Sequence, residues 1–478
     1  MSLDESLYEG VLESAQEAAE KIRSLIDEDK LFTIFCHNDA DGLAAGAIAS
    51  IMLLRESARF STRSVTNIDE ILNGVKDLPE GSVIILTDIG SGYLDELSKR
   101  VEDRVLIVLD HHAPVKAESK NLVHVNPHLH GVNGADEVSG AGVTYLVAKS
   151  LNHQNITSSP IAVVGALGDM QDRVDGRSLH GLNELIVEDA VKSGLIKVEE
   201  DLLFYGRSYK PIHVAMASTM NPFIPGISGN ESQAYSFLTR IGIKVKEDER
   251  WRVLAELDED ERKKLYNGLI RHLASLGASP SIARELIGKV YELIREEPWT
   301  YLRDAREFAS LLNACGKTDN DWIGIAIAMG ERGSLLEDAH NILEKYRAMI
   351  AEAMEHAMSE ENRQELRSIV VIDGGEVIND RLISSIATMI MSSGVIGEDK
   401  ILVAVASTQD SVKVSARASR KLVEKGIDLG EIIGKAAKLV KGRGGGHDIA
   451  AGAEIPKVKK ALFIMEVDRI AGEALRSS

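Results

Sequence analysis

The stretch 105–112, Val-Leu-Ile-Val-Leu-Asp-His-His, is an apolar run that ends in an acid and two imidazoles. Two runs upstream have the same form: 31–36 leads into His37-Asn38-Asp39-Ala40-Asp41, and 83–87 leads into Asp88. Short apolar runs of this kind are typical of buried β-strands, and ligands gather at the carboxyl ends of parallel strands. We therefore expect a parallel α/β sheet with a cluster of acids and histidines along one edge.

The residue types at these strand ends favour a metal centre. The motif His37-x-Asp39-x-Asp41 is not a calcium loop of the EF-hand type, which needs an acid at its first position and a Glu at its twelfth, where this chain has His37 and Ile48. A helix N-cap would account for one aspartate but not for two and a histidine. Asp169, which follows an apolar segment, adds a further acid. Their joint occurrence is better explained by metal binding than by turns or caps.

The donor set also indicates which ions bind. Carboxylates and imidazoles without a thiolate favour Mn²⁺ or Mg²⁺ over structural zinc. Many anionic ligands around one ion would repel one another, whereas two ions can share a bridging aspartate. Two-metal sites with ions ~3.5–4 Å apart activate a water molecule for in-line attack on phosphorus. We expect two Mn²⁺, with Mg²⁺ as the alternative, and phosphoester hydrolysis.

A second motif near the C-terminus suggests phosphate binding. Consecutive glycines, Gly444-Gly445-Gly446 before His447, let backbone N–H groups converge into an anion-binding nest, although a flexible loop is the simpler reading of glycines alone. The motif lacks the ending of a nucleotide P-loop. The net charge is −19, yet residues 411–443 hold nine Lys/Arg against three Asp/Glu. Binding responds to the local field, so a small basic surface for nucleic acid is expected here.

Composition sets the broad class. The 44% apolar and 27% charged content is typical of globular proteins, and no run approaches the ~18 apolar residues of a membrane span. The first residues lack the pattern of a signal peptide. Cys36 and Cys315 are far apart and form no Cys-x-x-Cys pair, which predicts neither a disulfide framework nor a structural zinc site. A cytoplasmic protein without a membrane partner is expected.

The order of elements predicts an α/β fold in three parts. Strand and helix patterns alternate over 31–112 and again from 368, with a hairpin expected from 402–406 and 412–417. Between them lie a Pro/Gly loop at 221–229 and helical patterns at 258–276, 281–296, 303–314 and 334–358. We expect a parallel-sheet domain at 1–190, a mostly helical insertion at 191–366 and a smaller α/β domain at 367–478.

Together these motifs resemble the DHH phosphoesterase superfamily. The resemblance covers 30–175 and 368–455 and includes the Gly-Gly-Gly-His of the DHH-associated C-terminal domain. The chain is most similar to the archaeal RecJ-like nucleases, the GINS-associated nuclease group, in its size, helical insertion and Pro-rich loop. The signature positions are all present: His37, Asp39, Asp41, Asp88, Asp110, His111, His112 and Asp169.

The resemblance implies a role for each position. His37, Asp39 and Asp88 would hold one Mn²⁺, and Asp41, Asp88, His111 and Asp169 the second, with Asp88 bridging. Asp110 would orient an imidazole, and His112 would lie near the scissile phosphate. Asp110, His111 and His112 are thus the expected catalytic residues. The substrate strand would be gripped by Ser415, Arg417, Arg443, Gly444, Gly445, Gly446 and His447.

The implied function is a Mn²⁺-dependent exonuclease that degrades single-stranded DNA, with RNA as an alternative substrate, to mononucleotides. The resemblance implies 5′-to-3′ digestion in replication and repair, with GINS and the replicative helicase as partners, but the residues themselves do not set polarity. Because no signature position is missing, we expect an active enzyme. Unlike in bacterial RecJ, no separate oligonucleotide-binding barrel is apparent, so processivity on long strands is not predicted.

Other functions are weighed against the exonuclease. An oligoribonuclease, a nucleoside bisphosphate phosphatase or a cyclic dinucleotide phosphodiesterase would act on smaller substrates, but such compact enzymes would not need an insertion of about 180 residues. A GINS-binding scaffold with secondary nuclease activity could use the acidic middle region for docking. Inorganic pyrophosphatases carry a different C-terminal domain, which disfavours that function.

Overall fold

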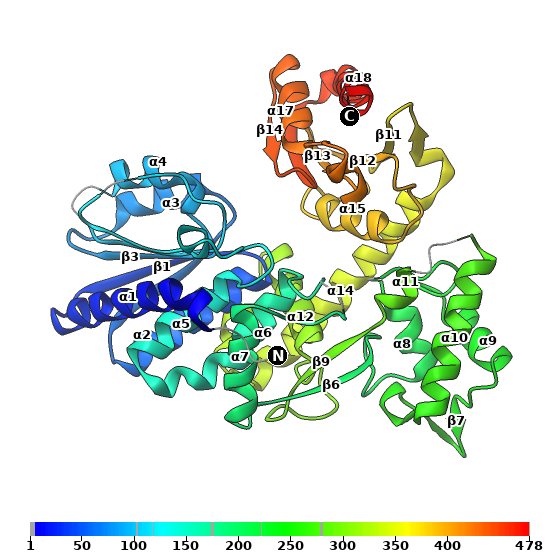
Figure 1. Cartoon of the computed structure of the whole chain (residues 1–478), viewed down its shortest axis with the longest axis horizontal. Coiled ribbons are helices and arrows are strands. Elements are labelled where there is room, and N and C mark those ends of the chain that lie inside the picture. Colours follow the sequence, from blue (N-terminus) through cyan, green and yellow to red (C-terminus); the bar gives the residue numbers. More distant parts are fainter. Residues whose placement is uncertain are drawn as a thin grey trace. The chain divides into compact units, whose positions relative to one another are not determined.

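The computed structural model describes residues 5–477, except for 102–103, 118, 174–175, 221 and 278–280. Figure 1 traces the chain. Contacts divide it into two units, of which unit 1 is Met1–Asp201 with Ile287–Glu344 and unit 2 is Leu202–Leu286 with Lys345–Ser478. The division into 1–190, 191–366 and 367–478 stays a prediction.

Unit 1 is built on a parallel five-stranded sheet of order β2-β1-β3-β4-β5. Cys36 pairs with Thr87, and Thr87 pairs with Leu109, so the chain leaves three neighbouring strands at the same edge. This confirms the parallel sheet expected from the sequence. The strands are β1 (Leu31–His37), β2 (Arg59–Val65), β3 (Val83–Thr87), β4 (Leu106–Leu109) and β5 (Leu122–Val125).

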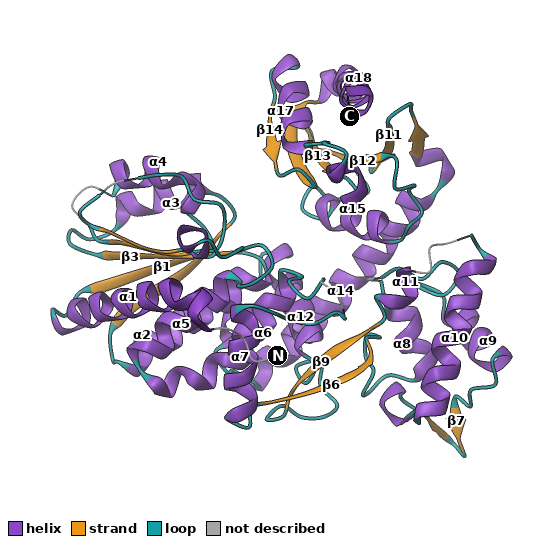
Figure 2. Ribbon diagram, viewed as in Figure 1, coloured by secondary structure: helices purple, strands orange, loops and turns teal. Residues whose placement is uncertain are grey.

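Helices cover both faces of this sheet, which explains its nearly continuous apolar strands (Figure 2). On one face α3 and α4 enclose a core that includes Phe35, Ile84 and Leu86. On the other, α2 and α5 contact the sheet and each other, and α1 and α6 pack against α5. Ser139 is the N-cap of α5, as predicted, and accepts a hydrogen bond from the N–H of Gly142. The helices are α1 (Glu9–Asp27), α2 (Ala40–Arg55), α3 (Ile68–Gly74), α4 (Leu94–Arg100), α5 (Gly140–Leu151), α6 (Ser159–Gly168) and α7 (Leu182–Lys192).

Part of the middle region belongs to unit 1. Helix α12 (Ala305–Lys317) packs on α2 and α6, and α13 (Asp321–Ala328) packs on α2. The strand β9 (Ile287–Leu293) pairs with β6 (Ile196–Leu202). The helix predicted over 281–296 is therefore wrong beyond the short α11 (Ser281–Arg284). The charge spacing suggested a helix, but Gly288 and the β-type residues Val290 and Tyr291 favour a strand once a partner is available.

A buried ion-pair cluster joins the segment after α6 to α12 in unit 1. Asp172, which is 2% exposed, lies 2.6 Å from the Nη2 of Arg306 and 3.2 Å from the Nε of Arg177. Burial alone would raise the pKa of Asp172, but the charges of Arg306 and Arg177 outweigh it and lower the pKa. The cluster therefore contributes to folding only while Asp172 is ionised.

Replacing Asp172 by Asn should destabilise the protein by roughly 3 kcal/mol at neutral pH, because two guanidinium groups lose their buried partner. Since the folded-state pKa is lowered, this contribution is fully present above the unfolded value of about 4 and is lost as the pH falls through the folded-state pKa. Urea unfolding of wild type and Asp172→Asn should show a difference in the free energy of unfolding that persists down to about pH 4. This difference should decrease only below that pH. If that difference in the free energy of unfolding stayed constant across the acid range, the charge of Asp172 would not be the cause of the stabilisation.

Unit 2 begins with a helical part. Asn221 of the predicted loop 221–229 lies outside the described residues, and the remainder of that segment is not helical. The predicted helix 258–276 is confirmed as α10. This part contains α8 (Ile212–Ser218), α9 (Glu231–Arg240), α10 (Glu259–Ser275), α11 and the hairpin of β7 (Lys246–Glu247) and β8 (Arg250–Trp251).

The rest of unit 2 is an α/β domain, as predicted. The long helix α14 (Gly333–Met358) leads into a six-stranded sheet of order β10-β11-β12-β13-β15-β14. The predicted hairpin is the antiparallel pair β12–β13, and α17 and α18 complete the core with Val403, Val414 and Phe463. The elements are β10 (Arg363–Glu365), β11 (Ile369–Asp373), α15 (Ile383–Ser392), β12 (Ile401–Ser407), β13 (Ser411–Arg417), α16 (Arg420–Glu424), α17 (Leu429–Leu439), β14 (Arg443–Gly446), β15 (Ala450–Pro456) and α18 (Lys460–Ser477). Among the described residues, no helix is both long and apolar enough to cross a membrane.

Candidate active site

Side chains from three strand ends meet at the carboxyl edge of the unit 1 sheet. His37 is the last residue of β1, Asp88 follows β3, and Asp110 follows β4. Helix ends add Asp39, the N-cap of α2, and Asp169, the C-cap of α6. Within each of three groups the potential ligand atoms lie within 4.8 Å of one another: His37 with Asp39 and Asp88; Asp41 with His111 and Asp169; and Asp88 with Asp110, His111 and His112.

Asp88 belongs to the first group and also faces His111 of the second. Its Oδ2 is 3.6 Å from His37 Nδ1, and its Oδ1 is 3.2 Å from His111 Nε2. The residue is 2% exposed, and its backbone φ of 59° is in the left-handed region that costs a non-glycine residue energy. Among the described residues Asp88 Oδ1 has no hydrogen-bond partner. A buried carboxylate oxygen left without one is costly, and a cation would satisfy it.

The second group surrounds His111. Its Nε2 lies 3.9 Å from Asp41 Oδ2 and 3.8 Å from Asp169 Oδ2. The carbonyl of Gly134, 2.7 Å from His111 Nδ1, orients the ring so that Nε2 faces the carboxylates. Asp41 is held by the N–H groups of Gly140 and Ala141 at the start of α5, at 2.6 and 3.0 Å. The start of α5 thus holds Asp41 in place, and the Gly134 carbonyl sets the direction of the His111 ring.

Short contacts also hold His37 and Asp39 of the first group. His37 Nδ1 lies 2.8 Å from Asp39 Oδ2, and Asp39 Oδ1 accepts a hydrogen bond from the N–H of Gly42 at 3.0 Å. Burial alone would raise the pKa of Asp39, but the charge of His37 and these hydrogen bonds lower it. A Cβ on Gly42 would lie 2.3 Å from the His37 carbonyl oxygen. Glycine is therefore required for this close approach.

The electrostatics of the cluster fit divalent cations. Burial and the charge of Asp88 raise the pKa of Asp41 well above its ordinary value, and burial with Asp88 raises that of Asp169 to about 6. Burial opposes a charge on His111, yet its close contact with Asp88 and the charges of Asp169, Asp88 and Asp41 raise its pKa. Divalent cations bound between these carboxylates would relieve the repulsion among them. The donors present, oxygens with imidazoles, suit Mn²⁺ or Mg²⁺.

Asp110 orients His112. The Asp110 carboxylate is fully buried and accepts hydrogen bonds from the backbone N–H groups of Ser91 and His111 and from His112 Nδ1, each at 2.8 Å. Burial alone would lower the pKa of His112, but the hydrogen bond to Asp110 raises it to about 9. The His112 side chain is 49% exposed, so its ring lies on the solvent side of the ligands.

The residues predicted to bind phosphate lie in unit 2. Ser415, Arg417 and Gly446 line a shallow depression with Ser384 and Lys413. The Arg417 guanidinium donates to hydroxyl groups of Thr388, Ser415 and Ser384, at 3.0, 3.0 and 2.8 Å, and to the carbonyl of Ala416. Burial lowers the pKa of Arg417 to about 10. Asp380 also lines the depression, but in the described part of the chain no ion pair joins a carboxylate to this guanidinium, which leaves its charge available to an anion.

The glycine-rich segment differs from its predicted form. Residues 443–446 are the edge strand β14, paired antiparallel with β15, and His447 lies in the exposed turn that follows. The extended backbone of residues 443–446 does not form the nest of converging N–H groups that the sequence suggested. The physical reason is the neighbouring helix: a Cβ on Gly444 would lie 3.0 Å from that of Ala437 in α17 and 2.9 Å from that of Ala453. The glycines let an edge strand pack closely.

Comparisons with known proteins identify the family. Family models match residues 31–168 (DHH family, N-terminal domain), 204–287 (DHH-CID domain) and 368–473 (DHHA1 domain). An uncharacterized protein of Methanocaldococcus jannaschii is 31% identical over 468 residues, covering 96% of this chain and 98% of that relative. The chain belongs to the DHH family.

Solved structures at lower identity share the fold of this DHH-family chain. RecJ from Thermus thermophilus in complex with Mn²⁺ is 16% identical, with a TM-score of 0.60, over 96% of this chain and 55% of RecJ, so the chain spans about half the length of that protein. CDC45 from Entamoeba histolytica is 10% identical, with a TM-score of 0.67, over 96% of this chain and 99% of CDC45. The predicted RecJ-like fold is confirmed.

Sequence reasoning missed the residues that support the DHH ligands. Gln171 donates to Asp169 Oδ2 at 3.0 Å and to the Gly134 carbonyl at 2.9 Å, and Asn183 donates to Gln171. Asn126 donates to the carbonyl of His112 at 2.9 Å. Gln171 could have been found from the sequence, because it lies two residues after Asp169. Asn126 and Asn183 could not, because their contacts depend on the folded arrangement.

The helix predicted at 303–314 is confirmed as α12, but its contact with the candidate site was not predicted. Asn313 accepts a hydrogen bond from the N–H of Ala40 at 3.0 Å, and Asn38 donates to the carbonyl of Gly316 at 3.4 Å. The charge of Lys317, the last residue of α12, also helps to lower the pKa of Asp39. The loop between β1 and α2 thus rests on a helix that is over 260 residues away in the sequence.

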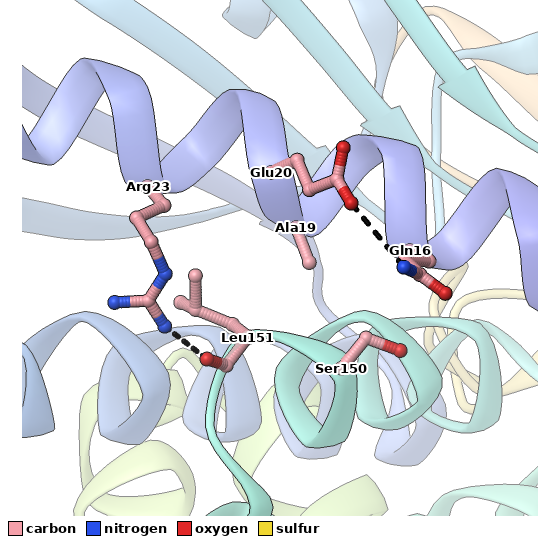
Figure 3. Close-up of a pocket in the computed structure, with 6 residues that line it drawn as sticks. All are labelled: Gln16, Ala19, Glu20, Arg23, Ser150 and Leu151. Carbon is pink, nitrogen blue, oxygen red and sulfur yellow. Dashed lines mark hydrogen bonds between the residues drawn. The ribbon is translucent and has the colours of Figure 1, made fainter.

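A separate pocket between α1 and α5 plays no part in this centre (Figure 3). Its carboxylate, Glu20, accepts a hydrogen bond from Gln16 at 3.2 Å, and its guanidinium, Arg23, donates to the carbonyl of Leu151. Its other lining residues are Ala19 and Ser150. None of the predicted catalytic or metal-binding residues lines it.

Proposed function

We propose that this DHH-family protein is an exonuclease that uses Mn²⁺, with Mg²⁺ as the alternative, to hydrolyse single-stranded DNA to mononucleotides in the 5′-to-3′ direction, with RNA as an alternative substrate. The observation that carries this proposal is Asp88, whose two buried oxygens face two separate groups of ligand atoms. Similarity of fold to RecJ, an exonuclease with structures bound to manganese, also supports it.

His37, Asp39 and Asp88 would hold one cation, and Asp41, Asp88, His111 and Asp169 the other. Cations bound there would activate water and neutralise charge on the phosphoryl oxygens during in-line displacement. The protein positions these ligands by its own contacts: the start of α5 holds Asp41, Gly134 orients His111, and Gln171 holds Asp169.

His112 is proposed to contact the scissile phosphate. Asp110 accepts from its Nδ1 at 2.8 Å, and Asn126 donates to its carbonyl, so both ring and backbone are held. The exposed part of the ring lies on the solvent side of the ligand cluster, where a strand would approach. Asp110, fully buried, acts through His112 rather than on the substrate.

In unit 2 the substrate strand is proposed to bind through a phosphate at Arg417. A half-buried guanidinium surrounded by hydroxyl groups can form short charge-assisted hydrogen bonds to phosphate oxygens. Ser415 completes that contact. Arg443, Gly444, Gly445 and His447 lie along or beside the exposed edge strand β14, where they would meet the adjoining nucleotide.

A time course on single-stranded 20-mers, labelled at either end and run as DNA and RNA in parallel with Mn²⁺, tests the activity. We expect mononucleotides throughout, early release of a 5′ label from DNA, and no reaction in EDTA. Intact strands after incubation with Mn²⁺ would refute the exonuclease. A preference for dinucleotides over 20-mers would instead favour an oligoribonuclease or a small-nucleotide phosphodiesterase.

Replacing Arg417 by Met should raise KM for the 20-mer by roughly tenfold to a hundredfold, because a hydrogen bond to a charged group contributes about 1.5–3 kcal/mol. Lys438→Met is the matched control, since Lys438 is an exposed cation on α17 outside the depression. If both variants change KM equally, general attraction by the basic surface, rather than a phosphate site at Arg417, explains binding.

Binding to GINS and the replicative helicase, and a place in replication and repair, belong to this proposal through the family resemblance. Co-purification of the Asp110→Ala variant with a GINS complex tests the partnership independently of nuclease activity. The cytoplasmic setting is proposed because Cys36 and Cys315 are both free thiols and both buried.

A further inference from the structure

The turn that ends α6 carries an unusual residue. The N–H of Met170 donates to the carbonyl of Leu167, and that of Gln171 donates to the carbonyl of Ala166. These two bonds define a Schellman motif, whose central position adopts a left-handed backbone and is usually glycine. Here the position is Met170, with φ at 58°. A side chain at this position strains the backbone, so glycine would be the more stable choice.

The neighbours of Met170 are both part of the metal centre. Asp169 belongs to the group around His111, and the buried Gln171 donates to Asp169 Oδ2 at 3.0 Å. Their side chains therefore converge on the ligands, while the Met170 side chain between them is 37% exposed. A large apolar group is thus presented to solvent within one residue of a proposed ligand.

We propose that Met170 contacts the nucleoside attached to the scissile phosphate and so positions the strand in the metal centre. This inference rests on the proposed function, which places that phosphate at the cations. The base and sugar next to that phosphate offer apolar faces, and Met170 is the exposed apolar residue adjacent to Asp169 in the chain. A flexible, polarizable thioether adapts to different surfaces, which suits an enzyme that must accept every base.

A matched pair of glycine substitutions separates strain from binding. Ser57 is also the left-handed central residue of a Schellman motif, with φ at 57°, and its N–H donates to Leu54 while that of Ala58 donates to Leu53. It follows the 16-residue helix α2, whose other end is at Asp39, and so lies about 24 Å from the metal centre. Met170→Gly and Ser57→Gly relieve the same backbone strain, but only the first removes a side chain beside the site. Met170→Leu keeps the apolar bulk.

The experiment measures the affinity for a fluorescent single-stranded DNA 12-mer with phosphorothioate linkages, in Mn²⁺, by anisotropy, together with thermal unfolding. We expect Met170→Gly to weaken binding roughly tenfold, the loss of a buried apolar contact of about 1.4 kcal/mol. The affinity of Met170→Leu should stay within about threefold of the wild-type affinity, and the affinity of Ser57→Gly should equal that of wild type. Both glycine variants should melt at or above the wild-type temperature, because each relieves strain.

Several outcomes would overturn the inference: equal affinities for Met170→Gly and Ser57→Gly, an equally large loss in Met170→Leu, or no binding of the 12-mer by wild-type protein. Cleavage of an unmodified 12-mer is measured separately. If wild type binds but does not cleave, the proposed exonuclease fails, while the affinities still decide whether Met170 contacts the strand.

Discussion

Asp88→Asn should lower the rate of strand hydrolysis by roughly a thousandfold or more, a loss of at least about 4 kcal/mol in transition-state stabilisation. Asp88 directs one oxygen to the His37 group and the other to the His111 group, so a single substitution affects both cation sites. An amide supplies one neutral oxygen and an NH₂ group, which faces imidazoles and carboxylates instead of a cation.

The same variant should lose the effect of Mn²⁺ on stability. Wild type should melt at a higher temperature when Mn²⁺ is added, because a ligand that binds only the folded state stabilises it. Asp88→Asn should show little of this shift. Calorimetric titration with Mn²⁺ and the rate on a labelled 20-mer are the two measurements. Asp95→Asn is the matched control, since Asp95 is an exposed acid on α4 of the same unit.

Retained hydrolysis in Asp88→Asn, at a rate near that of Asp95→Asn, would contradict a centre organised around Asp88. Loss of hydrolysis with an unchanged response to Mn²⁺ would be equally informative. It would place the cations elsewhere and reduce Asp88 to a structural residue at the end of β3.

The cluster of acids and histidines could be predicted from the sequence because its residues follow strands. A buried parallel strand needs a continuous apolar run, and such a run shows where the chain leaves the sheet. Once 31–36, 83–87 and 105–109 are assigned to one sheet, His37, Asp88 and Asp110 must lie at its carboxyl edge, whatever the order of the strands. The same logic predicts the neighbouring Asp39, Asp41 and His111.

What could not be predicted depends on contacts distant in the sequence. Asn126 and Asn183 support the ligands through hydrogen bonds that no local pattern encodes. The charge spacing over 281–296 predicts a helix where the structure has β9, because the pairing with β6, about 90 residues earlier, leaves no local pattern. The glycines of β14 predict a phosphate nest, since composition does not distinguish a loop from an edge strand packed against a helix.

The packing of helix α12 against the loop between β1 and α2 is the most consequential of these unpredicted contacts, and Gly316 tests its role. Substituting Ala for Gly in the interior of a helix ordinarily stabilises it by about 1 kcal/mol. Here a Cβ on Gly316 would lie 1.7 Å from the backbone oxygen of Asn38, between His37 and Asp39. Because the clashing atom belongs to the backbone, the clash can be relieved only if α12 or the loop between β1 and α2 moves.

Gly316→Ala should therefore reduce both stability and activity. Forcing an extra methyl group into a packed contact costs about 1–3 kcal/mol, which exceeds the gain in helix propensity. A shift of about 1 Å in a reacting group can lower a rate roughly a hundredfold, and His37 and Asp39 are the residues displaced. Strand hydrolysis in Mn²⁺ and urea unfolding measure the two effects.

The matched control is Gly434→Ala, a glycine inside α17 whose added Cβ would meet its nearest neighbour, the carbonyl oxygen of Gly444, at an ordinary 3.4 Å. This variant should unfold at the same or a higher urea concentration than wild type, since only helix propensity changes. If Gly316→Ala behaves in the same way and keeps its activity, α12 does not hold the loop between β1 and α2 in place. A loss of activity without a loss of stability would mean that the loop, rather than the helix, moves to accommodate the methyl group.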